Sequence, residues 1–243
     1  MFRFLSIAIA LVLGGCINLV THQPPSQPPT FAWRGDVALL NVVALDGSGN
    51  CSGWMISERE LITAAHCTEQ LISMTACFYP DLECVEPIRL KFIGSDMVHD
   101  VAVMQLPEGE KRRSFPVRTK PLVVAEVVYA VGYPVGEFSV TQGLFSQRHP
   151  AEHLWDSVYT DWLQHNALVA PGSSGGTLLD RDGNIVGMTI GGRTIGPRAT
   201  FFFMGIANPA DIIQAAYEAA MKSPAPPPSV GVVGEPKITR YPQ

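Results

Sequence analysis

The sequence predicts an all-β fold of two small barrels, closed by one C-terminal helix. Short apolar runs with alternating or β-branched residues recur between turn signals. Only one segment has helical spacing. The length of 243 residues, with 47% hydrophobic and 16% charged residues, suits one large β domain or two small ones. Even spacing of short strands is typical of barrels.

Eight runs are expected to form strands: residues 37–45, 52–57, 88–94, 101–106, 127–133, 176–180, 184–191 and 200–207. The helix is expected over residues 209–222, with Pro209 near its first position, Asp211 in its first turn and Lys222 at its end. Residues 148–164 give no strand signal and are interpreted as a loop. The turn 180–184, DRDGN, begins like a calcium loop but has Ile185 at the glycine position, so a hairpin turn is expected.

The N-terminus is typical of a bacterial lipoprotein signal. An apolar run over residues 4–13 is too short to span a bilayer and is followed by LGGC, which resembles a lipobox ending at Cys16. An ordinary signal peptide with a chance cysteine is the alternative. Ile17 is not the aspartate that retains lipoproteins at the inner membrane, so we expect a lipid anchor on Cys16 at the outer membrane of the cell envelope.

Proline-rich stretches mark the limits of the folded part. The expected organisation is a signal peptide over residues 1–15, a tether over 16–32, one folded domain over 33–222 and a disordered tail over 223–243. The net charge of −5 offers no basic surface, so nucleic acid is not an expected partner.

The cysteines fit an exported protein. Apart from Cys16 there are four, and an even set in an oxidising compartment predicts two disulfides. Among three possible pairings we expect Cys51 with Cys67 and Cys77 with Cys84. A zinc site at Cys67 and His66 is the alternative, but the sequence has no CxxC spacing, so no metal is expected.

Two motifs supply a candidate base and a candidate carboxylate. ITAAHC, residues 62–67, sets His66 just after an expected strand and beside an expected disulfide. HDVAVMQL, residues 99–106, opens a buried strand with Asp100, whose desolvation needs a partner. Taken alone, the first is an ordinary structural histidine and the second an ordinary turn residue.

The third motif is PGSSGG, residues 171–176. Its glycines permit positive φ and a close approach of the backbone, and a strand signal follows immediately. A flexible linker would not run straight into a strand, so the motif predicts a tight turn that presents a serine.

The three motifs together resemble, in their order along the chain, those of trypsin-like serine peptidases with the chymotrypsin fold. The resemblance covers about residues 36–217 and is strongest with the HtrA/Deg branch, which has blocks similar to SGWMIS, VVYAVGYPVGE, NALVAPGSSGGTLLD and GIANP. The Cys51–Cys67 pair is similar instead to the histidine-loop disulfide of animal trypsins. The resemblance implies a double six-stranded β-barrel, a serine endopeptidase acting on proteins or peptides, and no cofactor.

It also implies a role for each site residue. Ser174 is the expected nucleophile, His66 the general base and Asp100 the group that orients and stabilises the imidazole. The backbone N–H groups of Gly172 and Ser174 are the expected oxyanion hole.

The sequence departs from the family in two respects. Ser173 stands where trypsin-type zymogens need an aspartate, and no IVGG-like N-terminus is present, so activation by that salt bridge is not expected. No PDZ-like segment follows the peptidase motifs. A catalytically inactive fold, used as a binding or adhesion lipoprotein, is the alternative function.

The resemblance further implies a substrate pocket built by residues 168–171, 189–192 and 204–207. None of these carries an acid, which predicts small or medium aliphatic side chains on the acyl side of the cut. The expected wall residues are Leu168, Ile190, Gly191, Gly192, Met204 and Ile206.

Overall fold

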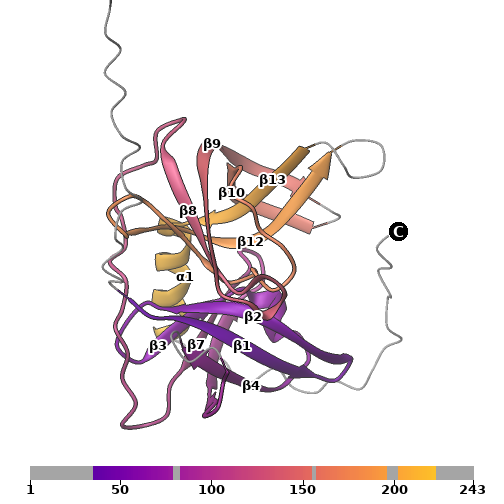
Figure 1. The fold of residues 1–243 in the computed structure, drawn as a ribbon, viewed down its shortest axis with the longest axis vertical. Coiled ribbons are helices and arrows are strands. Elements are labelled where there is room, and N and C mark those ends of the chain that lie inside the picture. The colour runs from indigo at the N-terminus through magenta and orange to yellow at the C-terminus, as the bar shows by residue number, and fades with distance from the viewer. Residues whose placement is uncertain (1–34, 79–82, 155–156, 196–201, 223–243) are drawn as a thin grey trace, which may run out of the picture. The chain divides into compact units, whose positions relative to one another are not determined.

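The computed structural model describes residues 35–78, 83–154, 157–195 and 202–222. The predicted signal, the whole of the tether with Cys16, and the C-terminal tail lie outside these residues. The described chain is built mainly from strands, with one α-helix at its end (Figure 1).

The first half of the chain forms a seven-stranded antiparallel sheet, drawn in indigo to purple in Figure 1. Its spatial order is β5-β4-β1-β2-β3-β7-β6. The strands are β1 (Val37–Ala44), β2 (Gly47–Met55), β3 (Glu60–Thr63), β4 (Leu71–Phe78), β5 (Ile88–Arg89), β6 (Lys91–Asp96) and β7 (Val101–Gln105).

The two ends of this order are consecutive in the chain. β5 pairs with β4 and β6 pairs with β7, and only Leu90 separates the two short strands. The run predicted as one strand over residues 88–94 is therefore broken at Leu90, whose N–H donates to the Met74 carbonyl at 3.0 Å. This one broken segment thus supplies both edge strands of the sheet, β5 and β6. The sheet therefore curls, although its two edges are not paired with each other.

The second half forms a closed six-stranded barrel of order β10-β13-β12-β11-β8-β9, as predicted. The strands are β8 (Val127–Gly132), β9 (Ser139–Leu154), β10 (Ser157–His165), β11 (Thr177–Leu179), β12 (Ile185–Ile195) and β13 (Phe202–Pro209). The prediction of a loop over residues 148–164 was wrong, because β9 and β10 form a long hairpin there. The hairpin turn predicted at residues 180–184 joins β11 to β12.

The helix α1 (Ala210–Lys222) begins one residue after Pro209 and packs on both halves of the fold (Figure 1). Its buried side chains, Ala210, Ile213 and Ala216, are spaced to lie on one face. They join a core that also contains Trp54 of β2 and Ile206 of β13. No helix among the described residues has the length and apolar character needed to cross a bilayer.

A second hydrophobic cluster takes side chains from all six strands of the closed barrel: Val128, Ala130, Phe145, Leu163, Leu178, Val186 and Ala207. Full burial of each large aliphatic side chain contributes about 1.5 to 3 kcal/mol. The first cluster spans both halves of the fold, and the second lies within the closed barrel.

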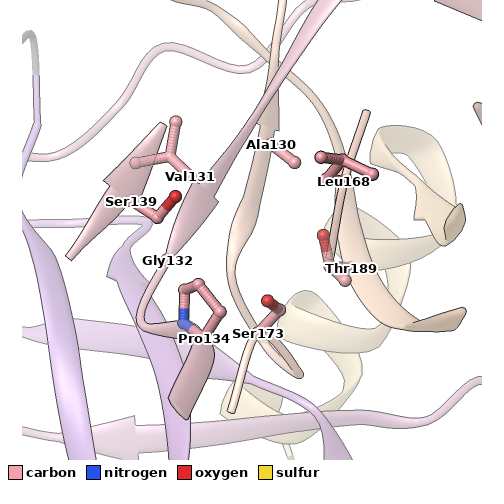
Figure 2. Close-up of a pocket in the computed structure, with 8 residues that line it drawn as sticks. All are labelled: Ala130, Val131, Gly132, Pro134, Ser139, Leu168, Ser173 and Thr189. Carbon is pink, nitrogen blue, oxygen red and sulfur yellow. The ribbon is translucent and has the colours of Figure 1, made fainter. Parts of the chain in front are cut away.

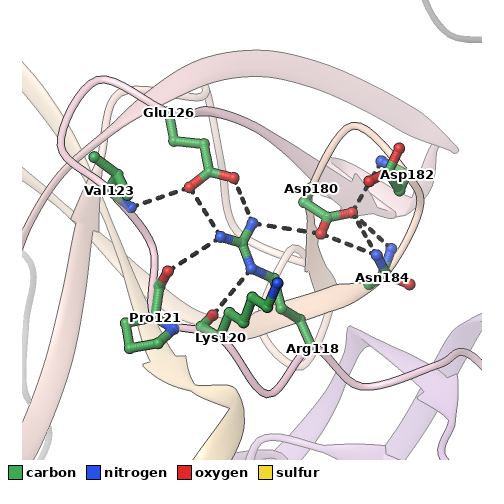
Figure 3. Close-up of polar contacts among 8 residues, drawn as sticks. All are labelled: Arg118, Lys120, Pro121, Val123, Glu126, Asp180, Asp182 and Asn184. Atoms are coloured by element: carbon green, nitrogen blue, oxygen red, sulfur yellow. Dashed lines mark hydrogen bonds and ion pairs between the residues drawn. The ribbon is translucent and has the colours of Figure 1, made fainter.

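Arg118 fixes the connection between the two halves (Figure 3). Its guanidinium binds the Glu126 carboxylate, approaches Asp180 at 3.4 Å and donates to two carbonyls of its own loop. The hydrogen bond from Arg118 lowers the pKa of Glu126 despite partial burial. Asp180 also accepts the N–H groups of Asp182 and Asn184, at 2.9 Å each, so its carboxylate closes its own turn without a metal.

Candidate active site

His66 lies on a short 3₁₀ turn, Ala65–Thr68, that follows β3 directly. Its neighbours Ala65 and Cys67 are buried, whereas the His66 side chain is 40% exposed. Cys67 is bonded to Cys51 of β2, with their Cα atoms 6.4 Å apart. The turn is thus held by packing and by a covalent bond, and only the imidazole faces solvent.

Both predicted disulfides are confirmed, because Cys77 is also bonded to Cys84, with a Cα–Cα distance of 5.2 Å. Cys67 is therefore not a free zinc ligand.

Asp100 ends the turn between β6 and β7 and meets His66 twice. Its Oδ2 accepts the His66 Nδ1–H at 2.8 Å, and its Oδ1 accepts the His66 backbone N–H at 2.8 Å. The carboxylate is only 6% exposed, and its φ of +53° is a left-handed conformation that aspartate tolerates better than most residues. The Asn208 amide of β13 donates to the His99 carbonyl and steadies this turn.

This contact sets the tautomer and basicity of His66. An Nδ1 that donates to Asp100 leaves Nε2 as the acceptor on the exposed side of the ring. Burial lowers the pKa of His66, but the hydrogen bond and charge of Asp100, with a smaller effect of Glu69, more than offset this and raise the pKa above its ordinary value. The pair is thus arranged as a base with its orienting carboxylate.

Ser174 lies on a loop of residues 170–176, named here the glycine loop, which leads into β11. The Ser174 carbonyl accepts the Ser52 N–H of β2 at 2.8 Å. Gly175, with φ of +82°, packs so closely that a Cβ there would come within 2.9 Å of the Ala64 nitrogen. Ala64 is two residues before His66, so the loop brings half-buried Ser174 beside the histidine turn.

No hydrogen bond joins His66 to Ser174 within the described part of the chain. Contacts between a nucleophile and its base tighten when substrate binds.

Ser173 is more deeply buried than Ser174. It is only 6% exposed, and its Oγ accepts the Ala170 N–H at 3.1 Å. Figure 2 shows its hydroxyl directed toward the space between the residues that line a small cavity. The cavity is lined by Ala130, Val131, Gly132, Pro134, Ser139, Leu168, Ser173 and Thr189. Ser174 is absent from this lining, so the two adjacent serines occupy different environments.

Two backbone donors of the glycine loop point away from every partner. Among the described residues, neither the Gly172 N–H nor the Ser174 N–H makes a hydrogen bond. The Pro171 carbonyl accepts the Val135 N–H at 2.7 Å, and a trans peptide directs its N–H opposite to its carbonyl. The Gly172 N–H is therefore directed away from Val135, with a φ of +98° that favours glycine.

The six expected wall residues differ in their exposure in the part of the chain that the structure describes. Ile190 and Ile206 are buried in the core, 5% and 0% exposed, because the register of β12 against β13 shifts between Thr189 and Gly191. Leu168 is 65% exposed and Met204 is half-buried. Gly191 and Gly192 lie opposite Ile206 and Gly205 in the β12–β13 pair.

Two residues near the site were not predicted. Ser52 contacts the glycine loop from β2, and His165 of β10 packs its ring against Gly205. A polar residue inside an otherwise buried strand is the only sequence signal for Ser52.

Comparisons with known proteins identify the family of this chain. The model of a trypsin-like peptidase domain matches residues 51–188. A probable periplasmic serine endoprotease DegP-like of Pseudomonas savastanoi is 30% identical over 174 residues, covering 70% of this chain and 33% of that protein. The serine protease Do-like HtrA of Bacillus subtilis is 31% identical over 153 residues, covering 58% of this chain and 33% of that protein. The chain thus spans about a third of the length of these relatives.

Solved structures show the same fold. The HtrA-type protease AlgW with a tripeptide has a TM-score of 0.66 at 24% identity, covering 76% of this chain and 60% of that one. A protease of M. tuberculosis in its active form has a TM-score of 0.68 at 21% identity, covering 84% and 88%. With the family model matching more than half of its length, this chain belongs to the trypsin-like peptidase domain family.

Proposed function

We propose that this chain is a serine endopeptidase that cleaves protein substrates through an acyl-enzyme on Ser174. The observation that carries the proposal is the His66–Asp100 pair beside a loop that presents Ser174 and two backbone donors with no other partner among the described residues. A purely structural ion pair would need neither the serine nor the donors. DegP-like and HtrA-type relatives, named as proteases, support the same reaction class.

In the proposed reaction, each group of the site has one role in each step. His66 Nε2 takes the proton of the Ser174 hydroxyl while its oxygen bonds to the substrate carbonyl carbon. The oxyanion accepts the Gly172 and Ser174 N–H groups, and each such donor lowers the barrier by about 3 to 4 kcal/mol. Asp100 stabilises the imidazolium, which then protonates the leaving amine. Water releases the acyl group by the same steps in reverse.

The glycine loop needs no zymogen-type salt bridge in this proposal. Ser173 replaces the aspartate of that bridge, and its hydroxyl is satisfied inside the loop by the Ala170 N–H. The carbonyls of residues 171–174 all accept hydrogen bonds from protein donors. This supports a site that does not depend on a freed N-terminus.

The proposed place of action is the bacterial cell envelope, with the domain tethered by a lipid on Cys16, at the outer membrane rather than the inner one. The names of the DegP-like relatives, which call them periplasmic, support an envelope protein. The Cys16→Ser variant should lose membrane attachment in cell fractionation. A variant that remains firmly in the membrane fraction contradicts the anchor.

We propose a preference for small or medium aliphatic residues on the acyl side of the cut. Residues 168–171, 189–192 and 204–207 supply no acid to pair a substrate lysine or arginine. Leaving that charge unpaired costs more than the ~1 to 3 kcal/mol that one methylene decides. Profiling a peptide library tests this, and dominant cleavage after basic residues refutes it.

Hydrolysis of casein by the full chain tests the proposed function. The wild-type protein should cleave it, Ser174→Ala should reduce cleavage to background with the fold retained, and Ser173→Ala should remain active as the matched control. A folded wild-type protein without activity on casein or on a peptide library would favour the inactive binding lipoprotein.

A further inference from the structure

Ser52 is a buried serine of β2 whose hydroxyl reaches a loop 120 positions away in the sequence. The side chain is 0% exposed, in a strand where its neighbours are apolar or glycine. Its Oγ–H donates to the Gly172 carbonyl at 2.7 Å, and its oxygen accepts the Tyr133 N–H at 2.8 Å. The hydroxyl therefore uses its one donor and one of its two acceptor positions, which ties it to one orientation.

The Gly172 carbonyl needs an anchor because glycine offers no side chain to restrain its backbone. Four consecutive carbonyls of the glycine loop each accept a hydrogen bond from one donor. The Pro171 carbonyl binds the Val135 N–H, and the Ser173 carbonyl binds the Gly176 N–H. Ser52 holds the other two, binding the Gly172 carbonyl with its hydroxyl and the Ser174 carbonyl with its N–H.

The same residue joins the loop to the histidine turn. Ser52 follows Cys51, whose disulfide partner Cys67 is adjacent to His66. The Ser52 carbonyl accepts the Thr63 hydroxyl at 2.8 Å, three residues before His66. Ser52 thus connects the segment that carries the base His66 to the loop that carries the Gly172 and Ser174 N–H donors.

We infer that Ser52 is a positioning residue, whose hydroxyl holds the Gly172–Ser173 peptide so that the Gly172 and Ser174 N–H groups stay directed at the oxyanion. The inference rests on the proposed function. Without the hydroxyl, the Gly172–Ser173 peptide is held only by the Ser173 N–H, which donates to the Ala170 carbonyl at 2.9 Å. The donors on either side of this peptide are then less well preorganised for the charge that develops in the transition state. Ground-state binding of substrate does not depend on these donors, so KM and kcat should separate.

Ser52→Ala in the full-length protein tests the inference, with Ser57→Ala as the matched control. Ser57 is half-buried, and its hydroxyl accepts the N–H groups of Arg59 and Glu60 at 3.1 and 3.0 Å, away from the glycine loop and the histidine turn. We expect Ser52→Ala to lower kcat for a peptide substrate by about 10- to 100-fold with KM changed less than threefold. Affinity for a peptide boronic acid, which forms a tetrahedral adduct, should fall in proportion, and Ser57→Ala should change kcat less than threefold.

The possible failures are distinguishable. If Ser52→Ala keeps wild-type kcat and boronate affinity, or loses no more than Ser57→Ala, the inference is wrong while the proposed function stands. If the wild-type protein itself is inactive, the proposed function is wrong. Should Ser52→Ala not fold, Ser52→Gly also removes the hydroxyl while it keeps the N–H to the Ser174 carbonyl. A kcat at the wild-type level in that variant also overturns the inference.

Discussion

Two histidines of this protein show how environment assigns a role to one residue type. His66 is 40% exposed in its side chain and bound to Asp100, and the charge and hydrogen bond of that carboxylate raise its pKa. His165 is 1% exposed and has no well-formed hydrogen bond from either ring nitrogen among the described residues. Burial lowers the pKa of His165 to about 4, and the Ala167 backbone offsets only part of this.

The difference separates a base from a packing residue. His165 stays neutral at neutral pH, and its ring fills the space that any side chain at position 205 would need. His66 has a carboxylate on one nitrogen and solvent near the other, which is the arrangement that proton transfer needs. A histidine in an apolar strand is thus not by itself a sign of chemistry; the carboxylate partner is.

The largest expected effect is the loss of activity when His66 or its partner Asp100 is replaced. His66→Ala and Asp100→Asn should each lower kcat/KM by about 10⁴-fold, because the three residues act as one unit and Asp100 sets the tautomer. The measurement is steady-state hydrolysis of a peptide substrate. His165→Leu should stay within about tenfold of wild type if it folds. Equal losses at the two histidines would show that the distinction is wrong.

The next effect appears in stability against pH and belongs to His165. Its pKa is about 4 when folded and about 6.5 when unfolded, so between these values only the unfolded state binds the proton. Stability should therefore fall as pH drops from 6.5 to 4, by up to about 3 kcal/mol at 1.36 kcal/mol for each pKa unit. Urea denaturation at pH 7 and pH 4.5 measures it. His165→Leu should show a smaller drop than wild type, and an equal drop would contradict the account.

The smallest expected effect is a shift in the pH at which kcat/KM falls on the acid side of the pH profile. His66 must be neutral to accept a proton, and its pKa is raised, so kcat/KM should fall as pH drops through a value above 6.5. Asp100→Asn removes the charge that raises the pKa, so the limb of its residual activity should move to lower pH. A limb at the same pH in both proteins would show that Asp100 does not set the basicity of His66.

Much of the fold could be predicted because apolar periodicity marks buried strands, as in β1, β7 and β8. β4 and the β9–β10 hairpin could not, since LISMTACF has mixed polarity and β9 is polar along much of its length. These strands are defined by pairing with distant partners, such as β1 with β4 and β10 with β13. Local sequence does not contain that information.

The site residues also divide into those that a local motif marks and those that depend on distant parts of the chain. His66, Asp100 and Ser174 lie in distinctive motifs, and the first two are in direct contact in the structure. Ser52 and His165 lie in strands and act through neighbours far along the chain, at Gly172 and Gly205. Burial of Ile190 and Ile206 follows from a register shift that no residue type announces.

The most direct test of the account is to map the residue that reacts with a fluorophosphonate. The reagent bonds to a serine only where a base and oxyanion donors activate it. Mass spectrometry of the labelled full-length protein should place the adduct on Ser174, with no label in Ser174→Ala and retained label in Ser173→Ala. An adduct on Ser173, label that persists in Ser174→Ala, or an unlabelled wild-type protein would contradict the claim that His66, Asp100 and Ser174 form a working triad.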